Sequence, residues 1–175
     1  MTISGPSKST LIRLMDFAAN QAQTEAPHHK LAPNIMLHRP FETTDDTNLV
    51  VDSLNKSLRN ARKTHVTVGE LRYHNSKYLV LPIHSPLELA NLWVNVCKQI
   101  SLLSGYKPLP YDRERILDIT IASGILNIGD GARHRIISQK YTLGRIELSD
   151  VKLLRKPVNE PSSNWEEVQT FSLPD

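Results

Sequence analysis

The stretch Thr64-His65-Val66-Thr67-Val68-Gly69 decides how the rest of this 175-residue chain is interpreted. Successive side chains of a strand point to opposite faces, so the two valines would be buried while the histidine and the threonine share the other face. The glycine then interrupts the alternation, which predicts a bulge or the end of the strand. An imidazole and a hydroxyl one pleat apart can contact the same phosphate group. The same pattern also occurs in an edge strand whose polar face is simply in water.

A second stretch, Leu117-Asp118-Ile119-Thr120-Ile121-Ala122-Ser123, repeats this alternation. Its aspartate and threonine lie on one face and its apolar residues on the other. We expect His65, Thr67, Asp118 and Thr120 to project into one cleft, with basic side chains at its rim.

Each of these strands closes a unit of the same order, strand, helix, strand. The first unit is predicted from a strand at 34–41, a helix begun by the polar run 43–47, and the strand at 64–68. The second is predicted from a strand at 78–83, a helix from 85 to 105, and the strand at 117–123. The helices carry two apolar stripes at helical spacing. They are Val50, Val51, Leu54, Leu58 and Ala61 in the first helix, and Leu89, Ala90, Trp93, Val96, Cys97, Ile100 and Leu103 in the second.

Further elements flank the two units. A helix is predicted at about 9–20, a turn or loop around Gly129-Asp130-Gly131, and strands at 145–154 and 165–173, with a bulge between Leu148 and Val151. We therefore predict an α+β fold, in which two β-α-β-like units with pseudo-two-fold symmetry surround a central cleft and additional strands follow. Residues 1–33 form an N-terminal helix and connection in this division, and residues 34–175 form a single domain.

Composition and charge narrow the function classes. The chain is 39% hydrophobic and 22% charged, as in globular proteins, and its net charge of +3 suits a phosphate-bearing ligand but not a general coat for nucleic acid. The single cysteine, Cys97, excludes an internal disulfide and a Cys-rich zinc site. The N-terminus lacks the apolar core of a signal peptide, and no apolar run is long enough to span a bilayer. We expect a cytoplasmic monomer that does not bind membranes.

The adjacent histidines His28 and His29 raise the possibility of a metal site. Nothing at helical or hairpin spacing completes a ligand set around them. We therefore predict no metal and no cofactor.

The order of elements and the run Thr64–Val68 resemble the two-histidine phosphoesterases, the superfamily that includes 2'-5' RNA ligase-like proteins and RNA cyclic phosphodiesterases. The resemblance extends over about residues 34–173 and rests on an H-x-T-x motif. It implies that two histidines exchange the roles of general base and general acid across a phosphate, that two threonines bind the phosphate oxygens, and that no metal is required. These roles carry over to His65, Thr67 and Thr120. Asp118 stands where the second histidine is expected.

This departure bears on catalysis. Aspartates have a reference pKa near about 3.9, so at neutral pH the side chain suits a base but not an acid. The basic run Arg133-His134-Arg135 is expected to contact the substrate, and His134 is a candidate for the missing acid. The alternative is a surface histidine in a basic loop.

The resemblance implies a metal-independent phosphodiesterase, a hydrolase with His65 and Asp118 as catalytic residues and Thr67, Thr120, Arg133, His134 and Arg135 as substrate-binding residues. Its substrate would be a cyclic or 2'-5'-linked phosphodiester of a nucleotide, a cyclic oligonucleotide or a short RNA. The alternative is a catalytically impaired nucleotide- or RNA-binding protein that uses the same cleft. A third interpretation is an interaction domain in which both polar faces are solvated.

Overall fold

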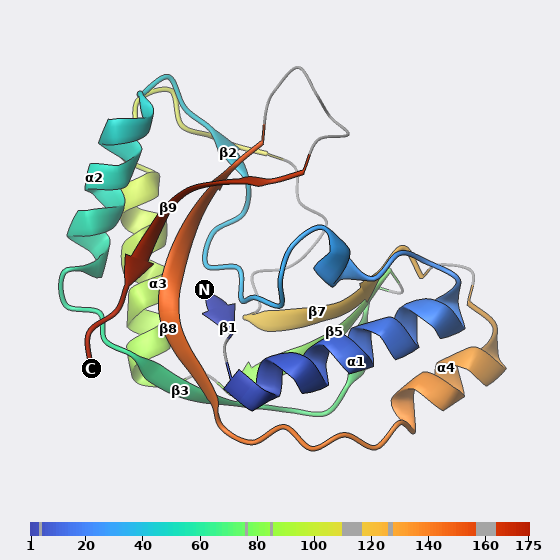
Figure 1. Cartoon of the computed structure of the whole chain (residues 1–175). Coiled ribbons are helices and arrows are strands. Elements are labelled where there is room, and N and C mark those ends of the chain that lie inside the picture. Colours follow the sequence, from blue (N-terminus) through green and yellow to red (C-terminus); the bar gives the residue numbers. More distant parts are fainter. Residues whose placement is uncertain (4, 76, 85, 110–116, 126–127, 157–163) are drawn as a thin grey trace.

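A curled antiparallel sheet flanked by helices forms the centre of the computed structural model (Figure 1). The structure describes residues 1–3, 5–75, 77–84, 86–109, 117–125, 128–156 and 164–175. These residues form both helices and strands, and the predicted α+β class is confirmed.

The elements fall into two groups. The helices are α1 (Gly5–Ala22), the short 3-10 helix η1 (Pro27–His29), α2 (Thr47–Leu58), α3 (Leu87–Ile100) and α4 (Asp130–Ile137). The strands are β1 (Thr2–Ile3), β2 (Phe41–Glu42), β3 (Thr64–Val68), β4 (Arg72–His74), β5 (Tyr78–His84), β6 (Lys107–Pro108), β7 (Asp118–Ser123), β8 (Ile146–Arg155) and β9 (Glu166–Ser172).

The strand β5 lies at the centre of the part of the sheet that carries both polar motifs. On one side it pairs with β3 and then with β4, and on the other side it pairs with β7, always antiparallel. The strands β3 and β7 therefore run parallel to each other with β5 between them. The strand β8 extends the sheet beyond β3 and also pairs with β1 and β9.

The irregularities predicted at Gly69, as a bulge or a strand end, and within the strand at 145–154, as a bulge, are both present as shifts in register. Val68 lies opposite Ile83 and Arg72 lies opposite Val80, so the strand running from β3 into β4 contains one extra residue. The backbone N–H of Gly69 still donates to the Pro82 carbonyl at 2.8 Å, so pairing continues into the bulge. In β8, the register against β1 shifts between Leu148 and Asp150, where the burial pattern also changes phase.

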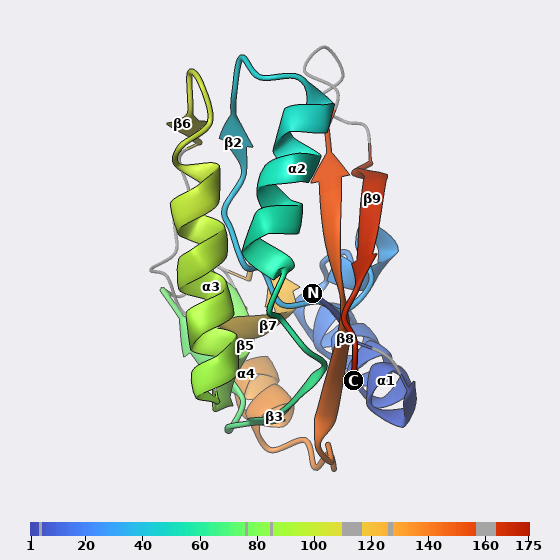
Figure 2. The same cartoon turned by 90° about the vertical axis from the view of Figure 1, so that its left-hand side faces the viewer.

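Most of the side chains predicted to face inward from α2 and α3 are buried, but the prediction for α3 needs one correction. In α2, Val50, Leu54 and Leu58 are buried as predicted. In α3, Leu89, Val96 and Ile100 are buried as predicted, but Leu92 is buried in addition and Trp93 and Cys97 are only half-buried. The inward face of α3 is thus rotated slightly from the predicted one. The two helices lie side by side along one flank of the molecule (Figure 2).

Two regions differ from the prediction. In the segment predicted as a strand at 34–41, only a single bridge from Asn34 to Thr2 and the start of β2 are paired as strand. Proline at position 40 has no N–H to donate to a ladder, which favours this short pairing. The predicted turn around Gly129 is followed by α4, which begins at Asp130 and contains Gly131. The buried side chain of Ile136 anchors this helix, so tertiary packing overrides the low helix propensity of glycine.

The helix α1 begins at Gly5, earlier than predicted, and packs against β7 and α4. Its side chains Leu11, Leu14, Met15 and Ala18 are buried in the same hydrophobic core as the sheet residues. Among the described residues, no helix combines the length and the apolar character that crossing a membrane requires.

Candidate functional site

The polar face of β3 is accessible to solvent. Val66 between its two polar residues is 1% exposed, whereas His65 and Thr67 are exposed. The alternation predicted for this strand is therefore present, with the imidazole and the hydroxyl on the outer face.

The strand register places the second polar motif on that same face. Residues opposite each other in an antiparallel pair share a face. Thr67 lies opposite His84 on β5, and Pro82, two residues before His84, lies opposite Asp118 on β7. Thr120 in turn lies opposite Val80. The structure therefore brings the polar residues of β3 and β7 to one face, which we call the polar face: His65, Thr67, His84, Asp118 and Thr120.

From the sequence, His84 is expected to lie outside the cleft, because it precedes a helix. The structure places it on the polar face, directly opposite Thr67 and exposed. A methyl group added to Gly69 would lie 3.3 Å from the His84 Nε2 atom, so the imidazole rests over this glycine. Since Gly69 follows Thr67 by two residues, Thr67 has His65 on one side along the strand and the His84 ring on the other. The strand register is the only signal that could have identified His84.

Asp118 is more deeply buried than His65, although both lie on the polar face. Its exposed fraction is 7%, and Thr120 beside it is half-buried. Neighbouring strands are spaced about 4.8 Å apart, so β3 and β7 are separated by roughly 10 Å across β5. His84 lies diagonally from both His65 and Asp118, at the roughly 7–8 Å typical of diagonal neighbours. His84 is thus the side chain between the two predicted catalytic residues.

A carboxylate accompanies His65. Glu147 lies opposite His65 on β8, and its Oε2 atom is 3.7 Å from the His65 Nε2 atom. Both side chains are nearly half exposed, so water screens this ion pair. Glu147 can orient the His65 ring when that ring is protonated. The sequence alone does not mark Glu147, which is identified by the register between β3 and β8.

The basic run 133–135 is held by other parts of the molecule. The Arg133 guanidinium lies 5.4 Å from the centroid of the Tyr73 ring, and the Arg135 Nε atom donates to the Gln21 side chain at 2.7 Å. His134 is exposed on α4. Burial raises the pKa of Tyr73, while the nearby Arg133 charge opposes this rise. A role of these basic residues in substrate binding stays a prediction.

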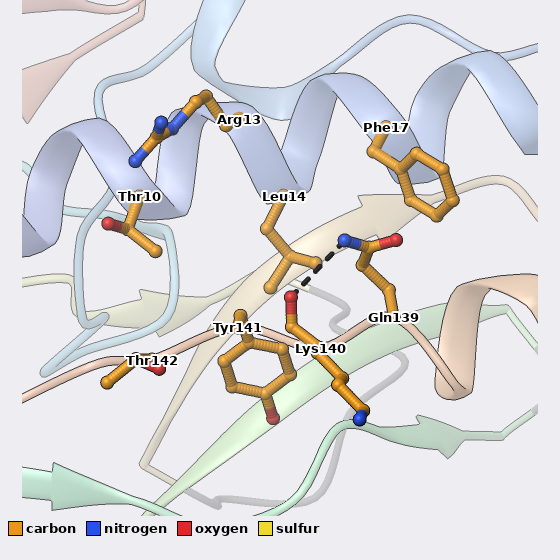
Figure 3. Close-up of a pocket in the computed structure, with 8 residues that line it drawn as sticks. All are labelled: Thr10, Arg13, Leu14, Phe17, Gln139, Lys140, Tyr141 and Thr142. Carbon is orange, nitrogen blue, oxygen red and sulfur yellow. Dashed lines mark hydrogen bonds between the residues drawn. The ribbon is translucent and has the colours of Figure 1, made fainter.

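A cavity of about 420 Å³ lies between α1 and the segment that follows α4 (Figure 3). Its lining residues are Thr10, Arg13, Leu14, Phe17, Gln139, Lys140, Tyr141 and Thr142. The Tyr141 hydroxyl oxygen accepts a hydrogen bond from the Leu71 N–H at 3.1 Å, next to the bulge after β3. Burial raises the pKa of Tyr141, so this phenol stays protonated at neutral pH. The lining contains none of the predicted site residues.

Compared with models of known protein families and with curated proteins, the chain matches none. The resemblance to the two-histidine phosphoesterases therefore rests on the H-x-T-x motif and on the order of the elements.

Proposed function

We propose that the polar face binds a phosphodiester, and that the protein hydrolyses cyclic or 2'-5'-linked phosphodiesters of nucleotides, cyclic oligonucleotides or short RNA without a metal. The observation that carries this proposal is the register that puts Thr67 between two exposed imidazoles, those of His65 and His84.

This arrangement suits the displacement of one phosphate oxygen by another. A phosphate bound by the Thr67 hydroxyl would have an imidazole on each side, one near the attacking water and one near the leaving oxygen. One imidazole takes a proton from water as the new P–O bond forms. The other gives a proton to the ribose oxygen as the old P–O bond breaks, so a cyclic phosphodiester becomes a phosphomonoester.

The role of Asp118 changes in this proposal. In the resemblance it takes the place of the second histidine, but it is 7% exposed and lies two strands from His65. His84 is exposed and lies opposite Thr67. We therefore propose His65 and His84 as the acid–base pair, with Asp118 and Thr120 binding the part of the substrate that extends toward β7.

The low exposure of Asp118 also favours a second candidate function. A buried carboxylate repels the phosphate that a catalytic cleft must accept, whereas it can accept hydrogen bonds from a sugar or a base. The second candidate is a nucleotide- or RNA-binding protein that holds its ligand without cleaving it.

The test is hydrolysis of 2',3'-cyclic nucleotides with a chelator present. We expect turnover by the wild-type protein, and a loss on the order of a hundredfold to ten-thousandfold for His65→Ala and for His84→Ala, because each removes an acid or base. The Asp118→His variant alters a proposed substrate-binding side chain and should not raise turnover, whereas a rise near neutral pH would assign the second acid–base role to position 118.

Circular dichroism of each variant, with and without chelator, checks that the fold is kept. Wild-type protein that binds the cyclic nucleotide and returns it intact would support the second candidate function. Turnover that is unaffected by His65→Ala would contradict the proposed mechanism, and turnover unaffected by His84→Ala alone would return the second role to Asp118.

A further inference from the structure

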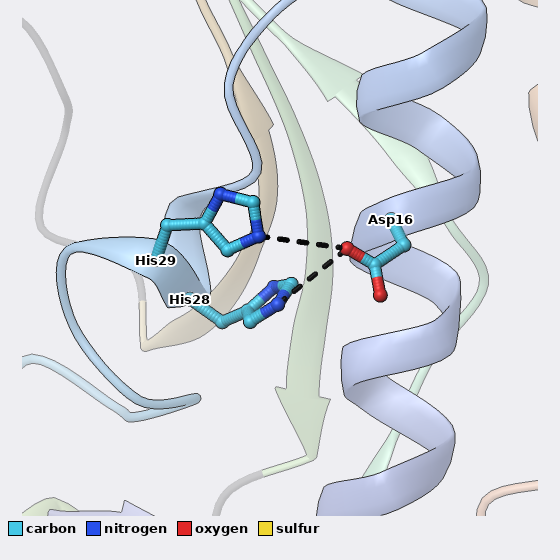
Figure 4. Close-up of side chains that lie close together, drawn as sticks. All are labelled: Asp16, His28 and His29. Atoms are coloured by element: carbon cyan, nitrogen blue, oxygen red, sulfur yellow. Dashed lines mark ion pairs between the residues drawn. The ribbon is translucent and has the colours of Figure 1, made fainter.

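The short helix η1 and the helix α1 bring together a cluster that the sequence analysis did not predict. The Nε2 atoms of His28 and His29 lie 3.5 Å and 3.9 Å from the same carboxylate oxygen, Oδ1 of Asp16 (Figure 4). The three ligand atoms all lie within 4.8 Å of one another. Asp16 is 12 residues before His28 in the sequence, so neither helical nor hairpin spacing connects them.

The distances in this cluster suit a shared cation better than direct hydrogen bonds. An N–H···O hydrogen bond is normally about 2.7–3.2 Å long, and both His–Asp distances exceed this range. A zinc ion binds nitrogen and oxygen at about 2.0–2.2 Å, so two of its ligands in a tetrahedron are roughly 3.3–3.5 Å apart. The distance between His28 and Asp16 already matches this separation, and the three ligand atoms lie within 4.8 Å of one another.

The His28 ring lacks the hydrogen bonds that its burial calls for. Its side chain is only 15% exposed, and among the described residues its Nδ1 atom is buried with no hydrogen-bond partner. Its Nε2 atom faces Asp16, at the 3.5 Å given above. A cation on Nε2 would replace this long contact with a direct bond to the ring, although it would leave the Nδ1 atom without a partner.

The orientation of the two rings supports the same conclusion. The His28 and His29 rings meet edge to face, with centroids 4.5 Å apart and an angle of 72° between their planes. They do not stack, and both Nε2 atoms point toward α1 (Figure 4). The nearby Glu25 carboxylate is paired with Lys30 at 2.7 Å and is therefore not counted as a ligand.

We propose that Asp16, His28 and His29 bind a divalent transition-metal ion, with Zn²⁺ as the best match to two imidazole nitrogens and one carboxylate oxygen. Asp16 and His29 are about half exposed, at 46% and 55%, so the ion can enter from solvent and water can complete its coordination. The bound ion ties η1 to α1 and is independent of the polar face.

The test uses protein without a polyhistidine tag. We expect isothermal titration to show one equivalent of Zn²⁺ bound, and Co²⁺ to give the visible absorption of a tetrahedral site. Mutations of groups that merely support a ligand cost about 10–100-fold in affinity, so Asp16→Asn and His29→Ala should each weaken Zn²⁺ binding by at least about a hundredfold. Both side chains are exposed enough for the variants to fold, which circular dichroism checks.

The matched control removes a histidine elsewhere. His134→Gln, on the exposed face of α4, should leave Zn²⁺ affinity unchanged. Zn²⁺ should also raise the melting temperature of the wild-type protein, because it binds only the folded state, and this rise should be absent in Asp16→Asn. Wild-type protein that binds Zn²⁺ no more tightly than Asp16→Asn, or equal weakening by His134→Gln, would overturn the proposal.

Discussion

The strands β3 and β7 carry nearly the same sequence pattern but lie in different environments. On β3, His65 and Thr67 are exposed and only Val66 is fully buried. On β7, Asp118, Ile119, Ile121 and Ala122 are all buried, and Thr120 is half-buried. The two strands share a polar face but not the same access to solvent.

Their neighbours explain this difference. The strand β3 lies between β5 and β8 within the sheet, whereas β7 pairs with β5 and packs against α1 and η1 (Figure 1). An alternating pattern therefore predicts which face a side chain occupies but not how deeply that face is buried. Depth depends on segments far away in the sequence, here residues 5–29.

The largest effect that distinguishes the two strands is on stability. Ile119→Ala removes a side chain that is 0% exposed, and we expect it to lower the free energy of unfolding by about 2–5 kcal/mol. Thr67→Ala, on the exposed face of β3, should change it by less than about 0.5 kcal/mol. Urea denaturation measures both. Equal losses would show that Ile119 is packed no more deeply than the exposed face of β3.

The sequence predicted local structure well because its signals are local. Asp46 caps α2, with its side chain accepting from the Leu49 N–H at 3.0 Å, and this helix start was read from polar residues at 43–47. The bulge after Val68 was read from Gly69. Propensity and periodicity act over a few residues, so one sequence suffices to detect them.

The site was only partly predictable, because its geometry depends on register. His65 and Thr67 came from the motif, but His84 and Glu147 join them only through the pairing of β3 with β5 and with β8. The approach of Asp16 to His28 likewise depends on the turn between α1 and η1. Such contacts link residues far apart in the chain, and no spacing rule gives them.

A smaller effect tests whether the polar side chains of β3 are exposed to solvent. Glu147→Gln removes the charge 3.7 Å from the His65 ring while keeping the shape of the side chain. Exposed ion pairs contribute about 0.2–1 kcal/mol, so stability should fall by no more than about 1 kcal/mol and the kcat/KM for 2',3'-cyclic nucleotides by no more than about fivefold. High salt should erase the difference from wild type, because it screens exposed charges. A loss of several hundredfold would mean that His65 and Glu147 are shielded from water as Asp118 is.

Another small effect on stability is expected at Gly69, where β3 ends. A methyl group there would lie 3.1 Å from the Pro82 Cγ atom and 3.3 Å from the His84 Nε2 atom, which is tight but not forbidden. The proline ring is fixed within β5, whereas the imidazole can rotate, so we expect Gly69→Ala to displace the His84 ring. Alanine restricts the unfolded chain more than glycine does, which stabilises the folded protein by about 0.4–1 kcal/mol and offsets part of the cost of the close contacts. The free energy of unfolding should therefore stay within about 1 kcal/mol of the wild-type value.

The kcat of Gly69→Ala shows whether His84 takes part in the reaction. If His84 is one half of the acid–base pair, Gly69→Ala should lower kcat although the protein remains as stable as before. Gly144→Ala is the matched control, because a methyl group at Gly144 meets nothing within 4 Å, and it should leave kcat unchanged. The NMR signals of the His84 ring report whether the imidazole has moved. A displaced ring with undiminished kcat would exclude His84 from the reaction, and the search for a partner of His65 would then return to the buried carboxylate on β7.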